Sequence, residues 1–304
     1  MAVNNRISSE VFEAKRWPYY LILPMSSLLV LWAMIKKKIY GMFRKKQEVN
    51  FLLFDGIGKY GKVIEKNVTG WKAVDLIYNH RFGENHSLGG RLDDFWFDNL
   101  NCQAARNRFK LAKRELEKAI LHFSNQGEVR VLSLAAGTGQ IESETIAKIK
   151  EKNINVKAIL IDRELEAIKR AQEFISLNAV SEDITLVHSD AKEAIYVAKD
   201  FKPHIIQMVA FLDYLPHEEA VRFISNLFEI LSEGGYFITS NTMPNVDMHF
   251  VKHVVGWPLI YRDHNEIGSI IRESGFAEFE IINEPLHIQN IVVARKTEGI
   301  PQAK

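Results

Sequence analysis

The 304-residue sequence predicts an α/β fold with a doubly wound, mostly parallel β-sheet. One reason is a series of short, mainly apolar runs, such as 131–134 and 156–162, whose hydrophobicity is typical of strands buried on both faces. A second is that segments with helical spacing, such as 141–152 and 164–178, separate these runs. The composition agrees, since 47% hydrophobic and 25% charged residues suit one large globular domain with an appendage.

The first segment, residues 1–48, combines an uncharged run with a basic flank. The run 19–35 is about one helix turn short of a comfortable membrane span. Aromatic residues near its ends, and the lysines and arginines that follow it, are typical of an anchor at a cytoplasmic, anionic leaflet. We therefore expect an N-terminal helical extension that associates with a membrane through residues 17–46. A spanning helix, a packed helix broken at Pro24 and a dimer contact are the alternatives.

The next segment, 49–125, combines an aromatic cap with a helix. Aromatic side chains are dense from 50 to 101, where they belong either to a cap over the following domain or to ordinary core. Between 103 and 123 an apolar stripe at helical spacing lies beside basic residues. We expect these to form a solvated face, with carboxylate or phosphate binding as the alternative. The basic residues are Arg106, Arg108, Lys110, Lys113 and Arg114.

Two glycines follow the apolar run 131–134. Gly137 and Gly139 let the backbone turn sharply and approach a ligand, and the amides that open the helix near Ile141 then face an anion. A dinucleotide fingerprint would carry a third glycine where this chain has Glu142. The loop therefore indicates an anionic ligand and argues against NAD and FAD.

Acids end the next two strand runs. Asp162 ends the run 156–162, at the place where a carboxylate accepts both hydroxyls of a nucleoside ribose. Asp190 ends the run 184–190, suitably placed to touch an adenine amino group. Because Glu193 follows at the spacing of a capping box, a structural helix cap is the alternative role of Asp190. With the glycine loop, these acids predict a nucleoside ligand.

With these three strand ends, the chain resembles the class I S-adenosylmethionine (SAM)-dependent methyltransferases, whose first motif runs acid-x-Gly-x-Gly-x-Gly. It departs from that motif at Ser133, where an acid is common, and at Ala135, where the first glycine is common. The resemblance implies a Rossmann-like catalytic domain at 126–298, with a seven-stranded sheet and a C-terminal antiparallel hairpin. It also implies SAM as the cofactor. The residues implied to bind SAM are Ser133, Ala135, Gly137, Gly139, Asp162, Arg163, Asp190, Ala191 and Ala210.

The resemblance also implies how SAM lies. The glycine loop holds its methionine end, Asp162 its ribose, and Asp190 with Ala191 its adenine. Ser133 binds the methionine ammonium through its hydroxyl or leaves that role to a neighbour. More narrowly, 104–108 and 257–262 resemble a bacterial methyltransferase family with a long N-terminal extension. Related enzymes include azetidine-2-carboxylate synthases, which cyclise SAM.

The loop after the fourth strand run, 205–210, should face the transferable methyl group. It lacks the Asn/Asp-Pro-Pro-aromatic sequence of DNA amine methylases, which argues against that substrate. Polar residues of this loop could remove a proton, align an acceptor or stack on the sulfonium. The predicted catalytic residues are Asp213, Tyr214 and His217.

After the fifth strand run, a polar loop and an insertion precede the last helix. We expect the insertion, 249–264, to act as a lid. His249 and His253 could share a helix face, but the spacing fixes no third ligand, so we predict no metal site. The chain then closes with two strand runs, 276–282 and 288–294, which form a hairpin. The predicted substrate-binding residues are Tyr214, Asn241, Tyr261 and Arg262.

Together these features predict a SAM-dependent methyltransferase that acts on a small, lipophilic molecule by direct in-line methyl transfer. An enzyme that cleaves or cyclises SAM, and a non-catalytic interaction subunit with the same fold, are the alternatives. A net charge of +1 provides no basic field for a nucleic-acid partner. A single cysteine, Cys102, fits a reducing compartment, so we expect a cytoplasmic location, at the cytoplasmic face of a membrane.

Overall fold

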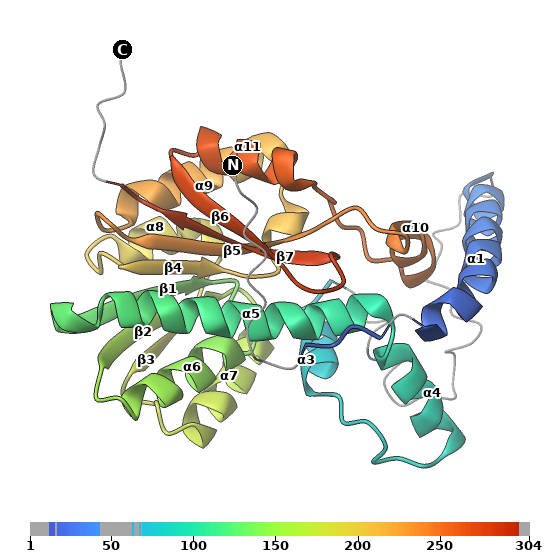
Figure 1. Cartoon of the computed structure of the whole chain (residues 1–304), viewed down its shortest axis with the longest axis horizontal. Helices are drawn as coiled ribbons and strands as arrows, with labels where there is room; N and C mark the ends of the chain where they lie inside the picture. Colours follow the sequence, from blue (N-terminus) through green and yellow to red (C-terminus); the bar gives the residue numbers. More distant parts are fainter. Residues whose placement is uncertain (1–11, 16, 43–62, 64–66, 68, 298–304) are drawn as a thin grey trace.

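The computed structural model describes residues 12–15, 17–42, 63, 67 and 69–297, and a seven-stranded sheet forms its centre (Figure 1). The strand order is β3-β2-β1-β4-β5-β7-β6. Strands β1 to β5 all pair in parallel, and β7 is antiparallel to both β5 and β6. The predicted sheet and its C-terminal hairpin are therefore confirmed. The strands are β1 (Glu128–Leu134), β2 (Asn155–Asp162), β3 (Ile184–His188), β4 (Ile205–Met208), β5 (Tyr236–Thr242), β6 (Glu278–Asn283) and β7 (Gln289–Arg295).

Helices cover both faces of the sheet (Figure 1). On one face, α5, α6 and α7 supply apolar residues such as Leu116, Ile146 and Ile175 to a core that includes Val131. On the other, α9 and α11 pack their buried residues against Phe237. The central strands are apolar on both sides because each side faces a helix layer. The helices are α5 (Leu100–His122), α6 (Gln140–Lys150), α7 (Leu165–Leu177), α8 (Ala194–Ala198), α9 (His217–Ile230) and α11 (His264–Glu273).

The strand order places a crevice at one edge of the sheet. β1 and β4 are neighbours although they are not consecutive in the chain. β1 leads into α6 on one face, and β4 leads into α9 on the other. The connections after these two strands therefore diverge, and ligands of open parallel sheets bind where this happens, at the carboxyl ends of the strands.

The segments ahead of α5 form three helices in the described part of the chain. α3 (Trp71–Asn79) and α4 (Leu88–Phe97) lie within the aromatic cap, and α3 contacts α5. α1 (Trp17–Met42) continues through Pro24, so the break that one alternative placed there is absent. It packs against the insertion at α10 (Met248–Phe250) and the following π-helix η4 (Val251–Val255).

The expected membrane segment, 17–46, is described as far as residue 42. Residues 43–46 lie outside the described residues. Among the helices described, none has both the length and the apolar character that crossing a membrane requires.

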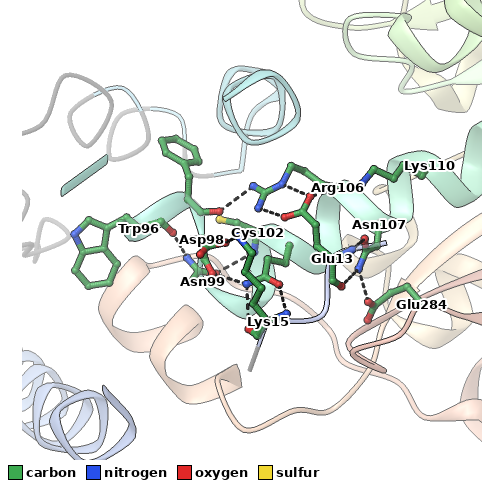
Figure 2. A network of polar contacts seen from close by, with 12 residues as sticks. Glu13, Lys15, Trp96, Asp98, Asn99, Cys102, Arg106, Asn107, Lys110 and Glu284 are labelled. Carbon is green, nitrogen blue, oxygen red and sulfur yellow. Dashed lines mark hydrogen bonds and ion pairs between the residues drawn. The ribbon is translucent and has the colours of Figure 1, made fainter. Parts of the chain in front are cut away.

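Two of the basic residues on α5 are buried, so the expectation of a solvated basic face is wrong for them. Arg106 is 7% exposed and Arg108 is 6% exposed. Figure 2 shows the Arg106 guanidinium facing the carboxylate of Glu13. The Nε–Oε1 and Nη2–Oε2 distances between them are 2.8 and 2.6 Å. The Asn107 amide binds both the backbone N–H and the carbonyl of Glu13. Burial of Arg106 is thus coupled to docking of residues 12–15.

Candidate functional site

The connection from β1 to α6 is a tight turn with three left-handed residues. Ala135, Gly137 and Gly139 have φ angles of 49°, 56° and 58°. A Cβ atom on Gly139 would approach Leu160 Cδ2 to 2.7 Å, so the backbone there lies close to β2. This geometry explains the predicted glycines, and Ala135 adopts the same backbone conformation in spite of its Cβ. The first amides of α6 consequently open at the crevice.

Asp162 lies at the end of β2, directly beside this turn. Its Oδ2 accepts a hydrogen bond from the Gly137 amide at 2.8 Å, and its Oδ1 accepts one from the Glu164 amide at 2.8 Å. Burial raises the pKa of Asp162, although these two amides act in the opposite direction. The structure thus brings together the glycine loop and the acid that the sequence singled out, and it fixes the orientation of the carboxylate.

A carboxyl group also lies beside Ser133, and it comes from Glu142 on α6. Ser133 Oγ donates to Glu142 Oε1 at 2.6 Å, and Gln207 Nε2 on β4 donates to the same oxygen at 2.8 Å. Glu142 is 2% exposed, and burial raises its pKa. The sequence singled out Glu142 only as a departure from a dinucleotide fingerprint. No spacing rule placed its carboxyl group at Ser133, where related motifs carry an acid.

The residues expected at the adenine end follow β2 and β3. The His188 ring bonds the carbonyl of Arg163 at 2.9 Å, so the two strand ends are adjacent. The Arg163 side chain is exposed and pairs with Glu164. Asp190 is exposed, and its Oδ1 accepts from the Lys192 amide at 2.9 Å, as a cap of the short 3-10 helix η2 (Ala191–Glu193). This contact supports the structural role of Asp190 as a helix cap.

The connection after β4 places Asp213 in a buried polar cluster. Asp213 is 2% exposed and lies in the 3-10 helix η3 (Leu212–Tyr214). Its two oxygens accept from the backbone N–H and the hydroxyl of Thr242, both at 2.8 Å. Burial raises the pKa of Asp213, and Thr242 and the nearby arginines offset this only in part. Just before η3, the left-handed Ala210 donates its amide to Ser240 Oγ at 2.8 Å.

Residues of the insertion lie against this connection. The Ile260 amide donates to the Asp213 carbonyl at 2.9 Å, and Trp257 Nε1 donates to the Tyr214 hydroxyl at 2.7 Å. Arg262 is 4% exposed and donates to the carbonyls of Leu212 and Leu215.

Two other predicted substrate-binding residues lie beside this contact, and one predicted catalytic residue does not. Asn241 donates to the Arg262 carbonyl, and the buried Tyr261 hydroxyl has no partner among the described residues. His217 is instead on the surface, where its ring bonds Glu273 at 3.0 Å. The predicted trio of Asp213, Tyr214 and His217 is therefore divided between two places.

Arg108, which sequence reasoning assigned to the solvated face, lies near Asp213 and Tyr214. Its guanidinium donates to the Tyr78 hydroxyl of α3 at 2.8 Å and to Gln289 Oε1 of β7 at 3.2 Å. Next to Tyr78, Asn79 bonds Gln140 Oε1 at 3.0 Å, so α3 links Arg108 to the first residue of α6. The sequence offered one signal, the alternative of carboxylate or phosphate binding. A charge pattern alone could not show which arginine is buried.

The comparisons with known proteins agree with this architecture. The model of a family described as "Putative methyltransferase" matches residues 31–296. A possible exported protein from Bordetella parapertussis has a similar structure, with a TM-score of 0.67, 14% identity, and 90% of this chain and 97% of that chain covered. The magnesium protoporphyrin IX methyltransferase of Synechocystis PCC 6803, with bound S-adenosylhomocysteine (SAH), gives a TM-score of 0.52 at 16% identity and covers 66% of this chain and 88% of that chain. No curated protein matches in sequence.

Proposed function

The chain belongs to this methyltransferase family, and on that premise we propose that it binds SAM at the glycine loop and methylates a small molecule. The observation that carries the proposal is the hydrogen bond from the Gly137 amide to Asp162. It holds a buried carboxylate beside a left-handed turn, at the edge of the sheet where the strand order reverses. A nucleoside with a charged tail fits this combination, because the acid accepts ribose hydroxyls while loop amides bind the tail.

The residues around the turn fit SAM in particular. SAM supplies an electrophilic methyl group on a sulfonium when it is bound. Asp162 would accept hydrogen bonds from the ribose, and the start of η2 would lie at the adenine. Ser133 donates its proton to Glu142, which leaves the hydroxyl oxygen free to accept from the methionine ammonium. Glu142 then supplies the carboxyl group that Ser133 lacks.

On the acceptor side, the chain offers positioning groups. Both oxygens of Asp213 are engaged by Thr242, so this acid holds the connection after β4 rather than standing free as a base. Tyr214 keeps a hydroxyl proton to donate to an acceptor, because its oxygen receives the Trp257 N–H. Methyl transfer gains mainly from alignment of acceptor and methyl carbon, so such a site needs no strong base. Cyclisation of SAM would require deprotonation of the methionine ammonium, and a carboxylate at Glu142 beside Ser133 would oppose that step.

Two measurements test the proposal. Calorimetry with SAH should show binding that is at least tenfold weaker in Asp162→Ala, because losing a hydrogen bond to a charged acceptor costs about 1.5 to 3 kcal/mol. Equal affinity in the variant would remove the proposed site. Incubation with SAM and an acceptor panel, with mass analysis of the nucleoside product, should yield SAH only when an acceptor is present. Methylthioadenosine formed without any acceptor would instead identify an enzyme that cleaves SAM.

A further inference from the structure

Two buried arginines on α5 differ in how their charge is matched. Arg106 faces the Glu13 carboxylate in a bidentate pair, as Figure 2 shows. Arg108 makes no ion pair with any described residue, and its guanidinium instead donates hydrogen bonds to the neutral side chains of Tyr78 and Gln289. Its Nε is buried without a hydrogen-bond partner in the described part of the chain. Burying a guanidinium without a matched anion is costly, so Arg108 requires an explanation that Arg106 does not.

The nearest acid does not supply that anion by direct contact. Asp213 lies close enough to Arg108 to influence its charge, yet both of its oxygens accept from Thr242. Burial opposes the charged form of Arg108, but Tyr78 and Asp213 outweigh it and raise the pKa, so the side chain stays cationic. The site therefore contains a buried positive charge whose hydrogen bonds are incomplete.

Arg108 and the tyrosines near it or near Asp213 have hydrogen-bond donors that no described residue uses. Arg108 Nε–H is free, and the Tyr261 hydroxyl is buried without a partner among the described residues. Tyr78 and Tyr214 accept hydrogen bonds through their oxygens and so retain hydroxyl protons to donate. A cation surrounded by donors suits a ligand that presents acceptor oxygens and a negative charge, which describes a carboxylate.

The position of the cluster favours the methyl acceptor over the cofactor as the source of that carboxylate. Asp162, the proposed ribose ligand, ends β2, whereas Gln289 begins β7, with β1, β4 and β5 between them. Four strand spacings correspond to about 19 Å. The Arg108 cluster lies at the ends of β4, β5 and β7. The glycine loop, which follows β1, therefore stands between this cluster and Asp162.

We propose that Arg108, with Tyr78 and Tyr261, binds a carboxylate group of the methyl acceptor. This inference rests on the proposed function and narrows the substrate class to small carboxylic acids. The aromatic side chains that hydrogen-bond in this cluster, Tyr78, Tyr214 and Trp257, would offer such an acid apolar surface. Arg108 acts as a specificity-determining residue, because its free N–H is satisfied only by a ligand that carries an acceptor there.

The test compares acids with their neutral amides on the full-length protein saturated with SAH. Calorimetry would use matched pairs, 4-hydroxybenzoate with 4-hydroxybenzamide and hexanoate with hexanamide. The acids should bind about tenfold or more tightly than the amides, as expected for loss of a charge-assisted hydrogen bond. Arg108→Gln should abolish this preference. Arg106→Gln is the matched control, since it removes a buried arginine of the same helix and should retain the preference for acids.

The outcomes separate the inference from the proposed function. If SAH binds but the acids bind no better than the amides, or do not bind, the inference is overturned while the proposed function stands. If SAH itself does not bind, the proposed function fails first. If Arg108→Gln weakens SAH about tenfold but leaves methylthioadenosine unaffected, the carboxylate is that of the methionine arm, and the acceptor assignment is overturned. Should Arg108→Gln not fold, Tyr78→Phe must weaken the acids selectively, and equal weakening of acids and amides contradicts the inference.

Discussion

The glycine loop allows a graded test of backbone strain, using three substitutions within five residues of the chain. Gly139→Ala adds a Cβ in the left-handed region and brings it within 2.7 Å of Leu160 Cδ2. Gly137→Ala adds the same strain, but its nearest neighbour is Trp71 Cβ at 3.8 Å, an ordinary contact. Ala135→Gly removes strain that is already present.

The magnitudes follow from these contacts. The left-handed conformation destabilises an alanine in the folded state by about 1 to 2 kcal/mol relative to glycine. Alanine also lowers the entropy of the unfolded chain, which stabilises the fold by about 0.4 to 1 kcal/mol. Gly137→Ala should therefore lower the free energy of unfolding by about 1 kcal/mol. Overpacking adds about 1 to 3 kcal/mol, so Gly139→Ala should lower it by about 2 to 4 kcal/mol. Ala135→Gly should raise it by up to about 1 kcal/mol.

Urea unfolding followed by intrinsic fluorescence would measure this series, with the slope against urea as a check on two-state behaviour. Equal losses for Gly137→Ala and Gly139→Ala would show that the contact with Leu160 does not matter. A less stable Ala135→Gly variant would refute the argument from strain. A double-mutant cycle with Leu160→Ala adds a direct test, because room beside Gly139 should make the two losses less than additive.

Three further outcomes are expected. Burial raises the pKa of the Glu142 carboxyl group above its ordinary 4.5, so the folded chain binds the carboxyl proton more tightly than the unfolded chain does. The free energy of unfolding therefore falls as pH rises from about 4.5 through the raised pKa. Glu142→Gln should therefore gain stability relative to the wild type across that window, and parallel pH profiles in urea titrations would contradict this. Glu13→Ala leaves Arg106 unpaired and should lower the free energy of unfolding by about 1.5 to 3 kcal/mol without changing SAH affinity in calorimetry. Asp213→Asn should reduce methyl transfer about tenfold or more, because Thr242 loses one of its two acceptors, while SAH affinity stays within about twofold. Methyl transfer would be measured as SAH formed, by mass analysis. Unchanged turnover would remove Asp213 from the acceptor site.

The sequence by itself determined the sheet and the position of its ligand-binding edge. Runs such as 131–134 and 156–162 are predominantly apolar because both of their faces are covered by helices, and this property is local to each run. Parallel strands end at the same edge, so Gly137 and Asp162 had to meet there, and the 2.8 Å contact between them follows from the order of elements. The C-terminal hairpin could likewise be predicted from its own segment, because it pairs two consecutive strands, β6 and β7.

Only the tertiary structure decided how the charged groups are matched. Arg108 and Gln289 are 181 positions apart, and Arg106 and Glu13 are 93 apart. Whether an arginine on a helix is solvated or buried depends on what those distant segments bring to it, and a charge pattern within one helix contains no such information. The same holds for Glu142, whose carboxyl group meets Ser133 because α6 folds back over β1. The apolar pattern that predicts burial is present within each segment. A buried charge is stable only with a partner, and the tertiary structure determines which residue that partner is.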